Sequence, residues 1–280
     1  MATWTLRGLS TPVAKSYWLD FAPQTQEKTA VLSMSGAVLP RLVAVARWLR
    51  KNPHSALAAI VLCVAVWAAT ELVDEAVYEK ESQAVDERIL LALRNPSDIS
   101  DPVGPAWVEE VGRDLTALGG VAVQVLVVLA GGTYLALRRA YRTLILLLMS
   151  IGGGIALSIL LKCIFNRDRP HLVPHGSWVY TSSFPSGHSM MSTITYLTLA
   201  VMLARIESRL HIKAFLIFVA VGISCLVGIS RVYLGVHWPT DVLAGWSMGT
   251  AWALLCSVVM RELQRRGQVE TADATAAASY

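Results

Sequence analysis

The stretch TLILLLMSIGGGIALSILLKCIFNRDRP, residues 143–170, begins with 19 residues that carry no charge and ends in a polar cluster that contains Lys162, Arg169 and Pro170. A helix needs ~20 predominantly apolar residues to cross the hydrocarbon core of a bilayer. We therefore predict a membrane-spanning helix over residues 143–161. The basic side chains that follow it then lie at one surface of the membrane.

Five other apolar stretches have a similar length, at residues 55–73, 115–137, 188–204, 214–229 and 240–260. Their hydropathy does not alternate as in barrel strands, and only helices or closed barrels satisfy every backbone polar group in lipid. The composition agrees, because only 16% of the residues are charged, against ~25% in soluble domains. This composition argues against a disordered chain, a nucleic-acid-binding domain or a soluble enzyme. We predict an all-α bundle of six transmembrane helices.

The distribution of Lys and Arg predicts the orientation of this bundle. If the N-terminus is inside, the inner segments carry 16 Lys and Arg residues and the outer segments carry 8, as the positive-inside rule requires. Both termini are then cytoplasmic. The predicted parts are a cytoplasmic N-terminal segment over 1–54, a six-span domain over 55–260 and a cytoplasmic tail over 261–280.

Two segments outside the spans have a predicted conformation of their own. Residues 37–49 are basic and interrupted by Pro40, which fits either an amphipathic helix on the inner membrane surface or a solvated lead-in to the first span. In the long outer segment 74–114 we expect a short interfacial helix near residues 85–94. Within the spans, the glycines at 152–154 and the pair Gly245 and Gly249 predict close helix packing.

Three polar clusters lie at the predicted outer ends of the spans. They are Lys162-x6-Arg169-Pro170, Pro185-Ser186-Gly187-His188, and Ser230-Arg231-x5-His237 with Asp241 four residues later. The seven-residue separation of Lys162 and Arg169 is two helical turns, so both cations can project from one side of a helix that Pro170 ends. All three clusters are predicted to face the same side of the membrane.

The chemistry of these residues predicts an anion site. Ser186 is a favourable N-cap, and the free Gly187 amide lies at the positive end of a helix dipole. Three cations, which in a membrane protein need an anionic partner, are added by Lys162, Arg169 and Arg231. A phosphate group fits, because it is tetrahedral, doubly charged and suited to the guanidinium fork.

Two histidines, His188 and His237, are predicted to flank that phosphate. Phosphoryl transfer needs a nucleophile on one side of phosphorus and an acid for the leaving oxygen on the other, and imidazole does either near neutral pH. Asp241 follows His237 by about one helical turn and is placed to hold its second ring nitrogen. The alternative is that Asp241 is only a first-turn acid after Pro239.

In order and without substitution, these motifs resemble the three-part signature of the type 2 phosphatidic acid phosphatases, the superfamily that includes the vanadium-dependent haloperoxidases. The resemblance covers residues 115–260. It implies that His237 attacks phosphorus and forms a phosphohistidine, that Asp241 orients His237, and that His188 protonates the leaving group and then activates water. It also implies that, without a metal or other cofactor, the phosphoryl oxygens are held by Lys162, Arg169, Ser186, Gly187 and Arg231.

The resemblance further implies a multi-pass enzyme of a bacterial inner membrane that removes phosphate from a lipid phosphomonoester or diphosphate on the periplasmic or extracellular side. Candidate substrates are phosphatidic acid, phosphatidylglycerophosphate and undecaprenyl diphosphate. The alternatives are a phosphotransferase with the same intermediate and a non-catalytic protein that binds or transports lipid phosphates; haloperoxidase chemistry is a remote one. The sequence names neither the lipid nor the oligomeric state.

We expect two other pairs of polar residues near the signature to have structural roles. His171 and His175 have a spacing typical of metal ligands, but Pro174 separates them and no carboxylate pair accompanies them, so a zinc site is not predicted. Arg167 and Asp168 are expected to shape their loop, with an ion pair between the two.

Overall fold

The computed structural model describes residues 53–74, 83–176 and 181–269. Within these ranges the helices, in chain order, are α2 (Pro53–Val73), α3 (Gln83–Ala92), α4 (Ala106–Ala117), α5 (Val121–Leu137), α6 (Tyr141–Phe165), α7 (Gly187–Ile206), α8 (Leu210–Tyr233) and α9 (Pro239–Arg265). An antiparallel pair, β1 (Arg94–Asn95) and β2 (Asp98–Pro102), lies between α3 and α4. The packing described below belongs to the unit that begins at Leu57. The segment 37–49 lies outside the described residues.

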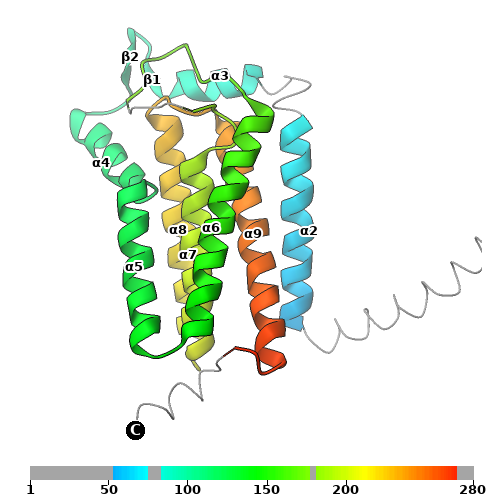
Figure 1. The fold of residues 1–280 in the computed structure, drawn as a ribbon. Helices are drawn as coiled ribbons and strands as arrows, with labels where there is room; N and C mark the ends of the chain where they lie inside the picture. Colours follow the sequence, from blue (N-terminus) through cyan, green and yellow to red (C-terminus); the bar gives the residue numbers. More distant parts are fainter. Residues whose placement is uncertain (1–52, 75–82, 177–180, 270–280) are drawn as a thin grey trace, which may run out of the picture. The chain divides into compact units, whose positions relative to one another are not determined.

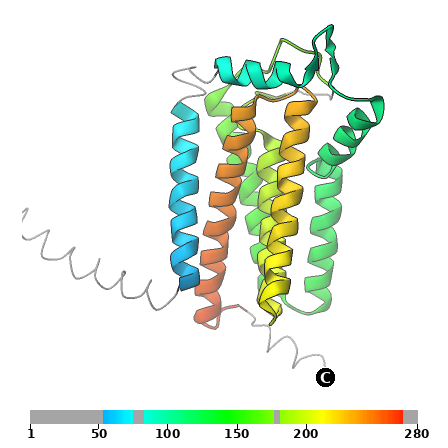
Figure 2. The same cartoon turned by 180° about the vertical axis from the view of Figure 1, so that it is seen from behind.

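Five of the six predicted spans each fall within one helix, and the long helices run side by side in both views (Figure 1, Figure 2). Three of them, α6, α8 and α9, are long and apolar enough to cross a membrane, and the α4–α5 pair makes a fourth when it is counted as one broken span. Their outward side chains are apolar and largely exposed, among them Leu126, Met149 and Phe218, as contact with lipid requires. The all-α membrane fold is confirmed to this extent.

The predicted span over residues 115–137 is wrong in its boundaries. The helix is interrupted after Ala117, and α4 and α5 are bent by 46° relative to each other. Gly119 lies in the break, where a Cβ atom would be 2.5 Å from Val227 Cγ1 and 3.3 Å from His188 Cβ. The bend brings α4 against α8 near its C-terminal end.

The central helix is α7, which packs along both α8 and α9. Its buried positions include many hydroxyl side chains, namely Ser189, Ser192, Thr193, Thr195 and Thr198. Such residues let neighbouring helices approach closely and bond to their own backbone, as Thr193 Oγ1 does to Ser189 O at 2.7 Å. Because α7 is surrounded by protein, it does not need the uniformly apolar surface of a lipid-facing helix.

Close packing at the two glycines of α9 is confirmed. A Cβ atom on Gly245 would lie 2.8 Å from Ser186 O, and one on Gly249 would lie 2.8 Å from Met190 O. The backbones of α7 and α9 therefore touch along their N-terminal halves. At the end of this contact, Ser186 N–H donates to Asp241 O at 3.0 Å.

The glycine triplet of α6 follows the prediction only in part. A Cβ atom on Gly153 would lie 2.4 Å from Trp252 Cζ2, and one on Gly154 would lie 2.7 Å from Ile194 Cδ1. Gly152 faces open space, because a Cβ atom there would have no neighbouring atom within 4 Å. Close packing is therefore wrong for Gly152 and correct for the other two.

The short helix predicted near residues 85–94 is present as α3, and it crosses the end of the bundle (Figure 1). Leu90 is fully buried and packs with Val232 and Trp238, which lie where α8 ends and α9 begins. The β1–β2 pair was not predicted, because RN and DISDP lack the alternating β-branched pattern of strands. Its buried Arg94 donates from Nη2 to Tyr233 O at 2.9 Å.

We expect Gly245→Ala to lower the free energy of unfolding by about 1–3 kcal/mol, because the added methyl group would overpack a backbone contact that cannot yield. Thermal unfolding in detergent measures the change. Gly152→Ala is the matched control and should leave stability unchanged or raise it by ~0.5–1 kcal/mol, since alanine is the better helix former. Equal unfolding temperatures for the two variants would contradict the close approach.

Candidate active site

The three predicted polar clusters meet at one end of the bundle, the end that carries α3 and the β1–β2 pair (Figure 1). Lys162 and Arg231 lie in the last turns of α6 and α8, whereas Ser186 and Asp241 lie at the starts of α7 and α9. The side chains close enough to His188 to act electrostatically on its ring are Lys162, Arg169, Arg231 and His237. The structure thus places the members of all three clusters around one site.

The end of α6 differs from the prediction, since Arg169 is not on the same helix as Lys162. The helix ends at Phe165, and Asn166 takes a φ of +22°, a conformation that asparagine tolerates better than most residues. The Asn166 N–H donates to Lys162 O at 3.3 Å. The chain then returns through a loop, and the two cations meet because of that loop and not through helical spacing.

Arg169 and Lys162 are both held by backbone carbonyl groups. Arg169 donates from Nε to Thr181 O at 2.9 Å, from Nη2 to Ser182 O at 3.4 Å and from Nη1 to Val236 O at 2.6 Å. Lys162 Nζ donates to the same Ser182 O at 2.7 Å. Burial lowers the pKa of Arg169 below its ordinary value, yet a guanidinium keeps its charge in proteins. Both cations are therefore in position before an anion arrives.

Arg231 is the most deeply buried of the three cations, with 2% of its surface exposed. Its Nη1 donates to Thr116 Oγ1 at 3.0 Å, while its Nε has no hydrogen-bond partner among the described residues. Across the described ranges, no carboxylate lies within ion-pair distance of Lys162, Arg169 or Arg231. A buried cation without an acid partner is costly, so these three have the capacity for an anionic ligand.

His237 lies between a cation and an acid. Its Nε2 is 3.2 Å from Arg169 Nη1, and because a guanidinium only donates, Nε2 must be the unprotonated nitrogen. Nδ1 then carries the proton and faces Asp241 Oδ2 at 3.4 Å. Burial lowers the pKa of His237 to about 3, against the opposing effect of Asp241. The ring is therefore neutral at neutral pH, with a lone pair on the nitrogen that faces the cations.

Asp241 is fully buried, and the two interpretations of it from the sequence are compatible. In the role of a first-turn acid of α9, Asp241 accepts a hydrogen bond at Oδ2 from Trp238 N–H at 3.0 Å. In the role of the residue that orients His237, the same oxygen faces the His237 ring, and it also accepts from Ser183 Oγ. Its Oδ1 accepts from Arg167 Nη1 at 2.6 Å. The carboxylate is thus fixed on both oxygens, which fixes in turn the ring that it faces.

The start of α7 borders the site beside Lys162. Ser186 is the N-cap, as predicted, and its Oγ accepts from Ser189 N–H at 3.5 Å and from Ser189 Oγ at 2.9 Å. Gly187 lies against α6, because a Cβ atom there would be 3.5 Å from Lys162 Cε. The first amides of α7 and the Lys162 side chain therefore border the same space, and His188 follows on the side of Gly119. This is the arrangement of a helix N-terminus that binds anions.

The sequence did not predict the contacts of Arg167. Besides Asp241, its guanidinium binds Asp86 of α3, with Nη2 donating to Oδ2 at 3.0 Å, so the expected ion pair with Asp168 is wrong. Asp86 is fully buried and accepts from Thr240 N–H at 3.0 Å and Thr240 Oγ1 at 2.6 Å. Burial raises the pKa of Asp86, while these hydrogen bonds oppose that rise. No motif spacing connects residues 86 and 167.

The two histidines with a spacing typical of metal ligands belong to the loop after α6. His175 Nε2 lies 2.8 Å from the carbonyl oxygen of Pro170, the residue that follows Arg169 in the sequence. In the parts of the chain that the structure describes, no group of three or more His, Cys, Asp or Glu side chains is placed to hold a metal ion.

Known proteins resemble this chain in sequence and in fold. Residues 143–265 match the family model of the PAP2 superfamily. A phosphatidylglycerophosphatase B from Bacillus subtilis is 35% identical over 181 residues, which cover 62% of this chain and 82% of the relative. The chain belongs to the PAP2 superfamily. A lipid A 1-phosphatase from Rhizobium etli is 30% identical over 185 residues, covering 56% of this chain and 75% of that protein.

A solved structure supports the same family. The crystal structure of a transmembrane PAP2-type phosphatidylglycerolphosphate phosphatase from Bacillus subtilis superposes with a TM-score of 0.60 and 28% identity, over 74% of this chain and 98% of that one. The family predicted from the three motifs is therefore confirmed. As a PAP2 member, the protein is a multi-pass membrane protein and a phosphoric monoester hydrolase of the lipid phosphatase type. All eight predicted site residues lie within the matched residues, whereas Asp86 precedes them.

Arg167→Lys should lower kcat by about 10- to 100-fold and leave KM for a lipid phosphate little changed. An ammonium group cannot bridge Asp86 and Asp241 as a planar fork does, and hydrogen bonds to charged groups contribute ~1.5–3 kcal/mol each. Phosphate release in detergent gives both constants.

The matched control for this variant is Arg113→Lys, which alters an exposed pair with Glu109 and should stay within about twofold of wild type. A raised KM with an unchanged kcat would place Arg167 on the substrate and contradict its contact with the Asp241–His237 pair as the cause.

Proposed function

We propose that this PAP2 protein hydrolyses a lipid phosphomonoester, or the terminal phosphate of a lipid diphosphate, at the outer membrane face through a phosphohistidine intermediate. One observation carries the proposal. Lys162, Arg169 and Arg231 converge on a helix start without a carboxylate partner among the described residues, and the unprotonated Nε2 of His237 faces Arg169. A phosphoryl group supplies the missing negative charge and the electrophile together.

In the first step, the lone pair of His237 Nε2 attacks phosphorus as the bond between phosphorus and the leaving oxygen breaks. His188, which takes up a proton when the bound phosphate offsets the charge of the three cations, donates that proton to the leaving oxygen, and the dephosphorylated lipid departs. The Nδ1 proton stays on the ring, where Asp241 Oδ2 stabilises the positive charge of the phosphorylated imidazole. The three cations and the α7 amides hold the nonbridging oxygens, on which charge is concentrated in the transition state.

In the second step, His188, now neutral, accepts a proton from water as the water oxygen attacks phosphorus. The N–P bond breaks, its electron pair returns to His237 Nε2, and inorganic phosphate leaves with the proton balance restored. If an acceptor hydroxyl replaced water in this step, the protein would be a phosphotransferase; hydrolysis is the simpler outcome because it needs no second substrate. A protein that only binds or transports lipid phosphates would not need an unprotonated His237 Nε2.

The proposed orientation has all six predicted spans crossing the membrane, with residues 1–54 and 261–280 in the cytoplasm and the domain 55–260 between them. The bias of Lys and Arg toward the inner segments supports it. The signature residues then face the periplasm or the extracellular space, because all of them lie at the opposite end of the bundle from the connection between α5 and α6. That connection carries Arg138 and Arg139, and Arg142 follows in the first turn of α6.

Phosphatidic acid, phosphatidylglycerophosphate and undecaprenyl diphosphate are the proposed substrate class. Two relatives support the class by name, one as a phosphatidylglycerophosphatase and the other as a lipid A 1-phosphatase. Both names describe phosphate removal from a lipid. The chemistry of the site specifies the phosphate and leaves the lipid to other parts of the protein.

We expect His237→Ala to reduce phosphate release from such a lipid panel by about 10³-fold or more, since removal of a catalytic nucleophile has cost up to ~10⁶-fold elsewhere. Purified protein in detergent and a phosphate assay suffice. His171→Ala, which removes a histidine outside the three motifs, is the control and should remain near wild type with an equal unfolding temperature. Turnover by His237→Ala at more than a tenth of the wild-type rate would refute the nucleophile.

Activity should survive EDTA, because three cations and a helix start supply the charge stabilisation that a metal ion gives other phosphatases. Rates are compared before chelation, after chelation and after Mg²⁺ is restored. Retention of about the full rate in all three is the expected result. Loss on chelation with recovery by Mg²⁺ would show that the reaction requires a metal.

A further inference from the structure

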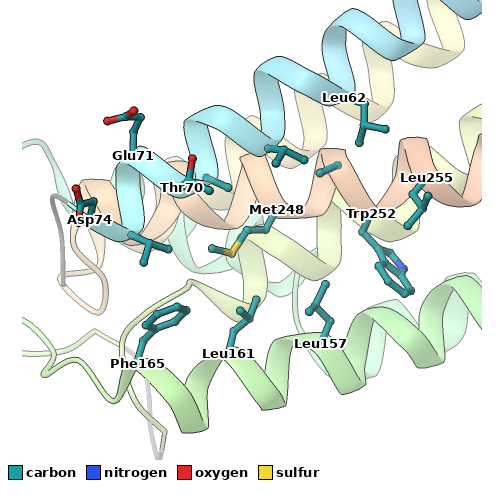
Figure 3. A pocket seen from close by; sticks show the side chains of 14 residues that line it. Leu62, Thr70, Glu71, Asp74, Leu157, Leu161, Phe165, Met248, Trp252 and Leu255 are labelled. Carbon is teal, nitrogen blue, oxygen red and sulfur yellow. The ribbon is translucent and has the colours of Figure 1, made fainter. Parts of the chain in front are cut away.

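A groove of about 850 Å³ lies between α2, α6 and α9, within the range of ~300–1,000 Å³ typical of ligand sites. Its walls are apolar side chains, including Leu157, Leu161, Phe165, Met248, Trp252 and Leu255. Figure 3 shows these side chains converging on the groove, with Glu71 of α2 and Asp74, directly after α2, at the same end as Phe165. No step of the proposed reaction uses this α2–α6–α9 groove.

The groove and the phosphate site lie on neighbouring faces of α6. Residues 157, 161 and 165 form one row along this helix, spaced by one turn. The next row contains Ser158 and Lys162, which face Gly187 at the start of α7. A ligand that leaves the groove at Phe165 therefore needs to turn by only one row of side chains, ~100° around the helix, to reach Lys162.

The two aromatic rings at the end of the groove strengthen this connection. Phe165 packs edge to face against Phe184, with 5.5 Å between ring centroids. Phe184 is fully buried and lies two residues before Ser186, the N-cap of the phosphate-binding helix. The pair forms a shared wall, with the apolar groove on one side and the polar cluster on the other.

The length of the groove matches one leaflet of a membrane. The lining residues at the two ends of the groove, Leu62 in α2 and Asp74 directly after it, are twelve positions apart, or ~18 Å at 1.5 Å per residue. Half of the ~30 Å hydrocarbon core is ~15 Å. The groove thus runs about as deep as a single lipid tail extends from the headgroup level.

The charges at the end of the groove define which way a lipid would lie. Glu71 and Asp74 repel a phosphate, whereas Lys162, Arg169 and Arg231 attract it. A lipid phosphate at this end is therefore drawn over Phe165 into the site while its chain stays in the groove.

We infer that the α2–α6–α9 groove holds a hydrocarbon chain of the lipid whose phosphate reacts at His237, an inference that rests on the proposed function. Lipid tails outside the protein are as apolar as the groove, so the groove contributes little affinity in a bilayer. Its effect is orientation, since a seated chain holds the phosphorus in line with His237 Nε2. Long chains that reach the depth of Leu157 benefit, whereas a six-carbon chain ends above it.

The test compares dioleoyl with dihexanoyl phosphatidic acid, which share a headgroup. Leu157→Trp and Ala251→Trp fill the groove from α6 and from α9. Each should lower the ratio of kcat/KM for the long chain to that for the short chain by about 10- to 100-fold, because a misplacement of ~1 Å can cost ~10²-fold. The matched control is Leu160→Trp, at a position of α6 that is 56% exposed and outside the groove lining, and it should leave the ratio unchanged.

The outcomes separate this inference from the proposed function. An unchanged ratio in both groove variants, or the same fall with Leu160→Trp, would overturn the chain site even though wild type still released phosphate in a His237-dependent way. Failure of wild type to release phosphate from either lipid would instead overturn the proposed function. Hydrolysis of the short chain by each groove variant verifies that its active site is folded.

Discussion

A fully buried carboxylate requires a hydrogen-bond donor at each oxygen, and Asp241 imposes that requirement on three separate segments. Its side chain accepts from Ser183, Trp238 and Arg167, which fixes the loop before α7, the start of α9 and the loop after α6. Its backbone carbonyl accepts from Ser186 N–H. The anion site forms where these segments converge, so most of its geometry follows from the burial of one acid.

The charges around this acid are divided into two groups by the ring of His237. On one side, Asp86 and Asp241 share the guanidinium of Arg167, so each acid has an ion-pair partner within the protein. On the other side, Lys162, Arg169 and Arg231 are held by carbonyl and hydroxyl oxygens. A carbonyl positions a cation without cancelling its charge, which leaves the full positive potential for a phosphate.

The apolar runs predicted the helices, and motif chemistry predicted the site, because both signals are local in sequence. Ser186 as an N-cap and Gly245 at a close contact needed only neighbouring residues to be recognised. The pairing of Arg167 with Asp86 joins positions 81 residues apart and has no local signature. The reversal at Asn166 was missed for a related reason: seven-residue spacing fits two helical turns as well as a loop that folds back.

In the resting protein, the lone pair of His237 Nε2 accepts a hydrogen bond from Arg169. A neutral acylating or alkylating agent that reached the pocket would meet a nitrogen already engaged and would have no means of displacing the guanidinium. A phosphate differs, because its own oxygens offer Arg169 a stronger acceptor. In the proposed mechanism, Arg169 would therefore both bind the phosphate and keep uncharged electrophiles from reaction at His237.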